Sequence, residues 1–364
     1  MFSFQPSDEQ KKLIEVVSRY AANDLRPVAR ELDEGEPLDS ALIEKGWELG
    51  ILQASTPEDY GGFGERSAVT GVLALEELAF GDFAGALAVM TPALFAMPIL
   101  LAGSEEQKQD YLPPIVESQW KAYTAALVEP SFDFDPNDLK TTARLEGDVY
   151  VISGKKMMVP FAKEAEAFIV YANLDGKTQG FIVSAELSGI HVGERGGFLG
   201  ANALPLYPVT FKDVRIPQGS RLGGADGHDM TPILISARLA MSAMALGVAR
   251  AAFEYARDYA KEREAFKVKI AQKQAIAFML AEMATEIEAI RLLTWQAAWM
   301  ADTGKPDAAK FAYLAHTGAT DMAMMVTDRA VQILGGHGYI REYPVEMWMR
   351  NGRGISSMTG LAML

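Results

Sequence analysis

Apolar residues recur at a helical period along residues 7–120. Near the start of this region they are spaced three or four positions apart, as in a helix that packs one face on a core, at Leu13, Val16, Val17 and Tyr20. Two serines, each followed by acidic residues and by a glutamine three positions on, predict helix N-caps at Ser7 and Ser104. We therefore expect a helical N-terminal domain over residues 1–120.

Short β-prone segments replace the helical period after residue 120. They cover residues 122–128, 150–153, 167–172, 179–183 and 207–211. Turn sequences such as Glu146-Gly147-Asp148 separate them. Several short strands separated by turns predict a small β-barrel or sandwich, to which we assign residues 121–227.

Long runs with a helical period return after residue 227. They cover residues 233–263, 273–302 and 307–334, and a fourth, shorter run follows Pro344. Gly304-Lys305-Pro306 separates two of these runs, and Gly335-Gly336 ends the third. Long apolar-striped helices with short links are typical of a helical bundle, so we expect one over residues 228–364.

One uncharged stretch, residues 83–103, is long enough to suggest a membrane span. Pro92 and Pro98 lie inside it, and a proline removes a backbone donor and strains the preceding helical turn. We therefore expect two buried helical pieces here and no membrane span.

The composition narrows the classes of partner and chemistry. A formal net charge of −14 over 364 residues disfavours binding to nucleic acid and to anionic membranes. The chain has no cysteine, which excludes disulfides, thiol catalysis and cysteine metal sites. Its four histidines show no ligand spacing, so we expect no metal site. The first residues lack a signal-peptide pattern, and we expect a cytoplasmic protein.

Several fragments occur in the same order as in one known family. They include PEDYGG at 57–62, GSEEQK at 103–108, REAF at 263–266, QILGGHG at 332–338 and EYPVE at 342–346. Over the whole chain this set resembles the acyl-CoA dehydrogenases. The resemblance implies an α+β fold with a helical N-terminal domain, a middle β-barrel domain and a C-terminal four-helix bundle. It also implies a dimer or tetramer, with FAD held between the β domain of one subunit and the bundle of its neighbour.

The resemblance also implies a reaction, the α,β-oxidation of an acyl-CoA thioester. In the family a glutamate removes the α-proton while a hydride leaves the β-carbon for the flavin. The family pattern places that glutamate at Thr359, and its other known position, just before Arg238, holds Ala237. A threonine hydroxyl is too weak a base to replace a carboxylate. No catalytic residue is therefore assigned, and Arg238 and Thr359 remain as expected substrate contacts.

The flavin contacts expected on the β domain are altered in the same way. Val128 stands where the family has a threonine, and Met158 and Pro160 replace a tryptophan and a second threonine. Pro160 offers neither a hydroxyl nor an N–H. Phe132 and Phe134 add bulky rings where the family leaves room for flavin or substrate.

The residues that the bundle would contribute to the FAD site of a neighbouring subunit match the family pattern more closely. The matching residues are Arg263, Phe266, Gln274, Gln332, Gly335 and Gly336. The arginine would pair with the pyrophosphate, and the glycines would allow close approach of the backbone. Lys267 departs from the family, which usually has glycine there.

This asymmetry gives three hypotheses. The first is a subunit of a heteromeric acyl-CoA dehydrogenase that completes the FAD site of a homologous partner; such assemblies act on bulky acyl-CoA substrates, including steroid side chains. The second is a homo-oligomeric flavoenzyme with a different base, for which Asp133 and Asp135 in the altered loop are candidates. The third is a non-catalytic acyl-CoA-binding scaffold without flavin.

Overall fold

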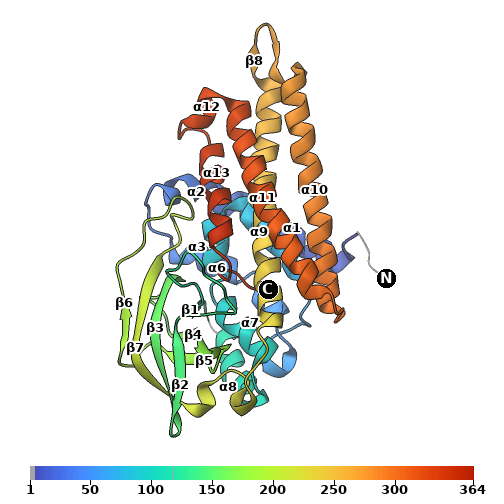
Figure 1. Ribbon diagram of the computed structural model, residues 1–364. Coiled ribbons are helices and arrows are strands. Elements are labelled where there is room, and N and C mark those ends of the chain that lie inside the picture. The colour runs from blue at the N-terminus through green and yellow to red at the C-terminus, as the bar shows by residue number, and fades with distance from the viewer. Residues whose placement is uncertain (1–4, 118) are drawn as a thin grey trace.

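The computed structural model describes residues 5–117 and 119–364 as an N-terminal group of helices, a β-sheet and a bundle of long helices (Figure 1). Both predicted N-caps are confirmed, because Ser7 and Ser104 each form a complete capping box with the glutamine three residues on. The first group comprises α1 (Asp8–Tyr20), a π-helical turn (Ala21–Leu25), α2 (Arg26–Asp33), α3 (Ser40–Trp47), α4 (Ile51–Ala54), α5 (Ala68–Gly81), α6 (Phe83–Val89), α7 (Ala93–Ala102) and α8 (Glu105–Val116).

The middle strands form one seven-stranded sheet in the order β1-β4-β2-β3-β7-β6, with β5 paired to β4. The sheet is mixed, because β1 and β2 pair with β4 in parallel while the other pairs are antiparallel. It is strongly curled, which is how the expected barrel is realised. The strands are β1 (Tyr123–Ala126), β2 (Thr142–Glu146), β3 (Val149–Pro160), β4 (Ala167–Leu174), β5 (Lys177–Ser184), β6 (Ile190–Val192) and β7 (Leu206–Pro217).

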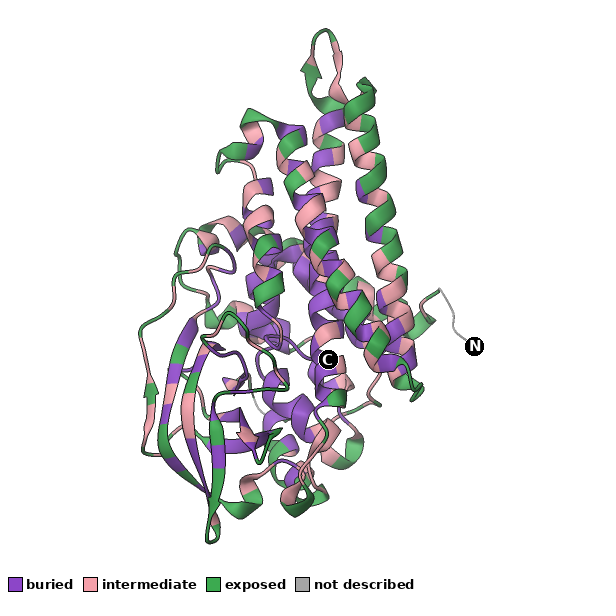
Figure 2. Ribbon diagram, viewed as in Figure 1, coloured by how far each residue is buried: buried purple, intermediate pink, exposed green. Residues whose placement is uncertain are grey.

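The helical bundle is built around α9, whose middle section is buried throughout (Figure 2). α9 lies so close to α5 that a Cβ added to Gly247 would be 2.3 Å from the Glu76 carbonyl oxygen, so only glycine fits there. The elements are α9 (Thr231–Glu262), a hairpin of β8 (Glu264–Ala265) and β9 (Val268–Lys269), α10 (Gln274–Asp302), α11 (Ala308–Leu334), α12 (Gly336–Tyr339) and α13 (Val345–Gly354).

Buried charges join the bundle to the N-terminal helices. Glu76 of α5 accepts from Arg250 of α9 at 3.1 Å and from Arg291 of α10 at 3.0 Å. Glu77 pairs with the same Arg250 at 2.7 Å. Since each of these side chains has an oppositely charged partner, the cluster fixes three helices relative to one another without leaving an unpaired buried charge.

The uncharged stretch is two buried helices, as expected, and the break lies at Pro92, as predicted, but not at Pro98. α6 and α7 meet at an angle of 55° at residues 90–92, whereas Pro98 lies inside α7. The helix continues because the hydrogen bonds on either side of Pro98 are intact, including Ala96 N–H to Pro92 O at 3.0 Å. In the described part of the chain α9 is also long and apolar enough to cross a membrane, but 89% of its apolar window is buried inside the protein.

Candidate active site

Thr359, the residue at the predicted base position, follows α13 and a 3₁₀ turn (Ile355–Ser357). The chain turns sharply after it at Gly360, whose φ of 86° favours glycine. A Cβ added to Gly360 would lie 2.6 Å from a Leu127 methyl group, so the loop is pressed against the segment that follows β1. This packing leaves Thr359 half-buried between the sheet and the bundle.

The partner of Thr359 is His316 of α11, a residue that sequence reasoning set aside. Thr359 Oγ1 and His316 Nε2 lie 3.3 Å apart. Burial, reinforced by the charge of Arg238, lowers the pKa of His316 to about 4, so the imidazole is neutral at physiological pH. Arg238 of α9 stacks on the Tyr313 ring, 5.2 Å from its centroid. The structure thus brings both expected substrate contacts near one neutral histidine: Thr359 lies against its ring, and Arg238 is close enough to lower its pKa.

Among the described residues, no carboxylate hydrogen-bonds to Thr359. Of the two acids considered as replacement bases, Asp135 acts electrostatically on Arg238. Asp135 itself is exposed and accepts hydrogen bonds from the Asn137 N–H at 2.8 Å and from its side-chain amide at 3.0 Å. Asp133 is exposed and accepts from the Ser131 hydroxyl. The base position therefore holds a hydroxyl and an imidazole.

The residues on the sheet side of the site are buried and apolar. Val128, Met158 and Pro160 are all closed off from solvent by the chain's own packing. The pairing of β3 with β7 is irregular between Lys156 and Val159, and Met158 within this irregularity has a φ of 57°. None of the three side chains offers a hydrogen-bond donor.

A buried ion pair that sequence reasoning missed holds this region in place. Lys156 of β3 is fully buried, and its Nζ lies 2.8 Å from Glu129 Oε1 and 3.1 Å from the Leu127 carbonyl oxygen. Glu129 also accepts from the backbone N–H groups of Lys140 and Thr141 at 2.6 and 2.8 Å. Burial lowers the pKa of Lys156 to about 8. Two opposite charges in otherwise apolar segments were the available signal for this pair.

The six residues predicted to hold the ADP part of FAD lie at the far end of the bundle. The β8–β9 hairpin and α12 mark this end, well away from the sheet (Figure 1). All six are exposed, with Phe266 presenting 89% of its surface at the tip of the hairpin. The residues are Arg263, Phe266, Gln274, Gln332, Gly335 and Gly336. One chain therefore does not bring the two halves of the predicted FAD site together.

Three family models cover the chain in sequence. They describe the N-terminal domain (residues 7–119), the middle domain (residues 124–214) and the C-terminal domain (residues 229–361) of acyl-CoA dehydrogenase. The chain belongs to the acyl-CoA dehydrogenase family.

Relatives and solved structures agree with the family models. The chain is 34% identical to the human mitochondrial short-chain specific acyl-CoA dehydrogenase, over 96% of this chain and 86% of that protein. The structure of butyryl-CoA dehydrogenase from Megasphaera elsdenii has a TM-score of 0.89 at 32% identity, covering 100% of this chain and 96% of that one. A structure of PigA with FAD and proline has a TM-score of 0.87 at 25% identity, with the same coverage. The family is one of FAD-dependent oxidoreductases, which confirms the expected fold and enzyme class.

The two halves of this acyl-CoA dehydrogenase chain fit FAD unequally. At the bundle end, an exposed guanidinium and exposed amides face outward, and a Cβ added to Gly335 or Gly336 would meet no atom within 4 Å. These groups suit a pyrophosphate and its adenosine. At the sheet, the isoalloxazine ring would need open space and polar partners, but Val128, Met158 and Pro160 are buried and apolar. The bundle end fits the cofactor and the sheet side does not.

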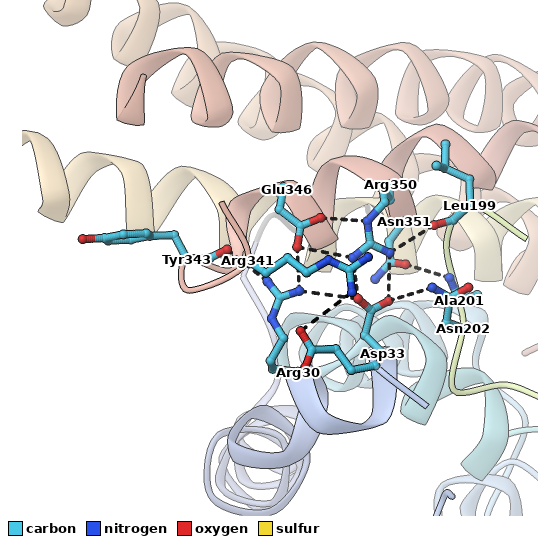
Figure 3. A network of polar contacts seen from close by, with 11 residues as sticks. Arg30, Asp33, Leu199, Ala201, Asn202, Arg341, Tyr343, Glu346, Arg350 and Asn351 are labelled. Carbon is cyan, nitrogen blue, oxygen red and sulfur yellow. Dashed lines mark hydrogen bonds and ion pairs between the residues drawn. The ribbon is translucent and has the colours of Figure 1, made fainter. Parts of the chain in front are cut away.

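A network of charged residues fixes α13, which leads to Thr359 (Figure 3). Arg350 Nη1 lies 2.9 Å from Asp33 Oδ1 of α2, and Arg350 Nε lies 2.8 Å from Glu346 Oε2. Asn351 Oδ1 accepts from the Ala201 N–H at 2.8 Å, which ties in the loop before β7. Arg30 of α2 reaches Glu346 at 2.5 Å. The position of the Thr359 loop is therefore set by contacts from all three parts of the chain.

Proposed function

We propose that this chain is the subunit without a catalytic base in a heteromeric acyl-CoA dehydrogenase. In this assembly it completes the FAD site of a homologous partner that carries a glutamate at the position of Thr359. The reaction is the α,β-oxidation of an acyl-CoA thioester, in which bound FAD supplies the chemistry of accepting the hydride. We place the assembly in the cytoplasm, and by analogy with mixed assemblies in the family its acyl group is bulky, as in steroid side chains.

One observation supports this proposal above the others: the bundle-end half of the FAD site is exposed and polar in this chain, whereas the sheet-side half is buried and apolar. The bundle-end residues Arg263, Gln274 and Gln332 are exposed and available to another subunit. The sheet-side residues Val128, Met158 and Pro160 are buried and their side chains have no hydrogen-bond donor, and the base position holds Thr359 beside a neutral His316. A pair formed with a complete partner then contains one full FAD site, made of the partner's sheet and this chain's bundle end.

In that site Arg263 would pair with the pyrophosphate of FAD, and the side chains of Gln274 and Gln332 would bind polar groups of its ADP part. Gly335 and Gly336 would let the backbone of this chain approach the cofactor closely. Arg238 and Thr359 belong to the second, incomplete site. No carboxylate hydrogen-bonds to Thr359 among the described residues. Deprotonation of the substrate α-carbon is therefore assigned to the partner.

The proposal is tested by purifying the chain alone and together with a glutamate-containing homologue, then counting flavin by absorbance and measuring acyl-CoA oxidation with an artificial electron acceptor. The chain alone is expected to hold far less than one FAD per chain and to show no turnover. The mixed assembly is expected to hold one FAD per pair and to turn over. Stoichiometric FAD with turnover in the chain alone would refute the proposal, and a mixture that stays colourless would favour the scaffold hypothesis.

The electrostatic contact between Asp135 and Arg238 favours one second candidate, a homo-oligomeric flavoenzyme in which Asp135 is the base. If so, Asp135→Asn abolishes turnover of the chain alone, while Asp133→Asn, which removes an acid two residues away, leaves it unchanged. Equal rates in both variants exclude this candidate.

A further inference from the structure

The hydroxyl group of Thr359 and the imidazole of His316 form the kind of pair that nucleophilic catalysis uses. An alcohol is a weak nucleophile until an adjacent base takes its proton, and a neutral imidazole is the side chain that most often does so. The 3.3 Å between Thr359 Oγ1 and His316 Nε2 is within the range that such pairs show before a substrate binds. The two groups come from the turn after α13 and from α11, so the packing of the bundle holds them together.

The imidazole of His316 is in the protonation state that a general base needs. Its other ring nitrogen, Nδ1, is buried and has no partner among the described residues. Since none of these residues fixes the tautomer, the form with an unprotonated Nε2 is available to accept the Thr359 hydroxyl proton. Burial and the charge of Arg238 lower the pKa of His316 to about 4, so its neutral form is a base of about the strength of a carboxylate.

Two backbone donors beside the Thr359 hydroxyl have no acceptor in the described part of the chain. They are the N–H groups of Thr359 and Gly360, whereas the next N–H, that of Leu361, donates to Met358 O at 3.1 Å. Gly360 is buried, and a buried N–H without an acceptor is uncommon in a folded protein. In hydrolases with a serine nucleophile, the N–H of the nucleophile or of the following residue stabilises the oxyanion that forms on the substrate. The unpaired donors here occupy the same two positions relative to the hydroxyl.

We infer that the incomplete site of this subunit hydrolyses acyl-CoA thioesters, with Thr359 as the nucleophile and His316 as the general base. The inference rests on the proposed function for its substrate, because Arg238 and Thr359 are the expected contacts of an acyl-CoA. A thioester suits the pair, since its thiolate leaves more readily than the alkoxide of an ester. Flavin takes no part, so the closed sheet side does not prevent the reaction.

Hydrolysis proceeds in two steps without any change of oxidation state. In the first, Thr359 Oγ1 bonds to the thioester carbonyl carbon as its proton passes to His316 Nε2. The carbon–sulfur bond then breaks, the CoA sulfur takes that proton from His316, and the acyl group stays on Thr359 as an ester. In the second, a water molecule gives a proton to His316 Nε2 and bonds to the same carbon, and the departing Thr359 oxygen takes the proton back. The products are free CoA and a carboxylic acid.

The test incubates the full chain, without flavin or electron acceptor, with cholyl-CoA, the thioester of a bulky steroid side chain. A chromogenic disulfide reagent measures the thiol of released CoA, and the protein adds no background because it has no cysteine. The variants are Thr359→Ala, Thr359→Ser and His316→Gln. One matched control is Thr317→Ala, at an exposed position of α11 whose hydroxyl donates to the Tyr313 carbonyl oxygen at 2.6 Å. The other is His191→Gln, at an exposed position of β6.

The parent chain is expected to release CoA faster than buffer alone. Thr359→Ala and His316→Gln should each lower the protein-dependent rate about a hundredfold, because each removes one member of the pair. Thr359→Ser keeps a hydroxyl and should retain most of the rate, and the two controls should retain all of it. After a single turnover with excess parent protein and an acid quench, mass spectrometry should find the acyl group on Thr359.

Release of CoA at the buffer rate by the parent chain would overturn the inference. Equal rates in the parent, Thr359→Ala and His316→Gln, or an acyl group attached to any residue other than Thr359, would also overturn it. These outcomes leave the proposed function standing, because they involve neither flavin nor a partner. Failure of the proposed function shows instead as stoichiometric FAD and acyl-CoA oxidation in the unaccompanied chain.

Discussion

Thr359 Oγ1 and His316 Nε2 lie 3.3 Å apart at the position where an acyl-CoA dehydrogenase is expected to carry its glutamate. Because burial and Arg238 hold the pKa of His316 near 4, the imidazole is neutral and this pair is uncharged at neutral pH. The α-carbon of a thioester is a weak acid, and a positioned carboxylate is what removes its proton in this family. The chemical consequences of this substitution are open to direct measurement.

Restoring the carboxylate alone is expected to be insufficient. Thr359→Glu in the isolated chain should show no acyl-CoA oxidation, because Val128, Met158 and Pro160 still close the sheet side to the flavin. In the mixed assembly, Thr359→Ala should change kcat by less than about twofold, since this residue makes no contact in the complete site. A large loss of kcat in that assembly would show that Thr359 takes part in catalysis.

Removing the exposed guanidinium at the bundle end is expected to weaken FAD binding to the assembly. Arg263→Ala should raise the Kd for FAD about tenfold or more, because a charge-assisted pair with the pyrophosphate is lost. Arg257→Ala is the matched control and should leave the Kd unchanged, because Arg257 lies in α9 six residues earlier with its charge paired to Asp258 at 2.8 Å. The fluorescence of released FAD measures the Kd of both variants. Equal Kd values would show that Arg263 does not bind FAD.

The buried imidazole is expected to make stability depend on pH. The folded-state pKa of His316, about 4, lies below its unfolded value of 6.5, so the unfolded chain binds more protons between these values. The contribution of the neutral imidazole is complete above pH 6.5 and is lost as the pH falls toward 4, up to about 3 kcal/mol. Urea unfolding of His316→Gln should lack this fall, and parallel pH profiles of parent and variant would contradict it.

Breaking the Glu129–Lys156 pair is expected to destabilise the fold. Lys156→Met leaves the Glu129 carboxylate buried without its cation, which should cost about 3–5 kcal/mol in the free energy of unfolding. Lys155→Met, at the exposed neighbouring position, should change it by less than about 0.5 kcal/mol. Chemical denaturation of the two variants side by side gives the comparison, and similar midpoints would show that the buried pair contributes little.

The hairpin at the bundle end contains a strained position. Lys267 has a φ of 66° in the turn between β8 and β9, where glycine has no steric penalty. Lys267→Gly should therefore raise the free energy of unfolding by about 1 kcal/mol. Lys269→Gly, at a residue with a φ of −60°, should lower it instead. Thermal melts that shift in the same direction for both variants would contradict this reading of the turn.

The sequence alone determined the order and type of most elements, because these depend on neighbours within a few residues. The capping boxes at Ser7 and Ser104 and the long helices of the bundle follow from local spacing and were predicted. The family pattern located Thr359 and the exposed residues at the bundle end. The prediction of a break at Pro98 was wrong, because a buried helix tolerates the one hydrogen bond that this proline removes.

Only the tertiary structure decided which distant side chains meet. His316 beside Thr359, Lys156 beside Glu129, and Asp33 beside Arg350 each join positions between 27 and 317 residues apart. No periodicity or spacing records such a meeting, because it depends on how α11, the sheet and the N-terminal helices pack together. The sequence set the residue types at this site, and packing determined which of them are closed, paired or left open to another subunit.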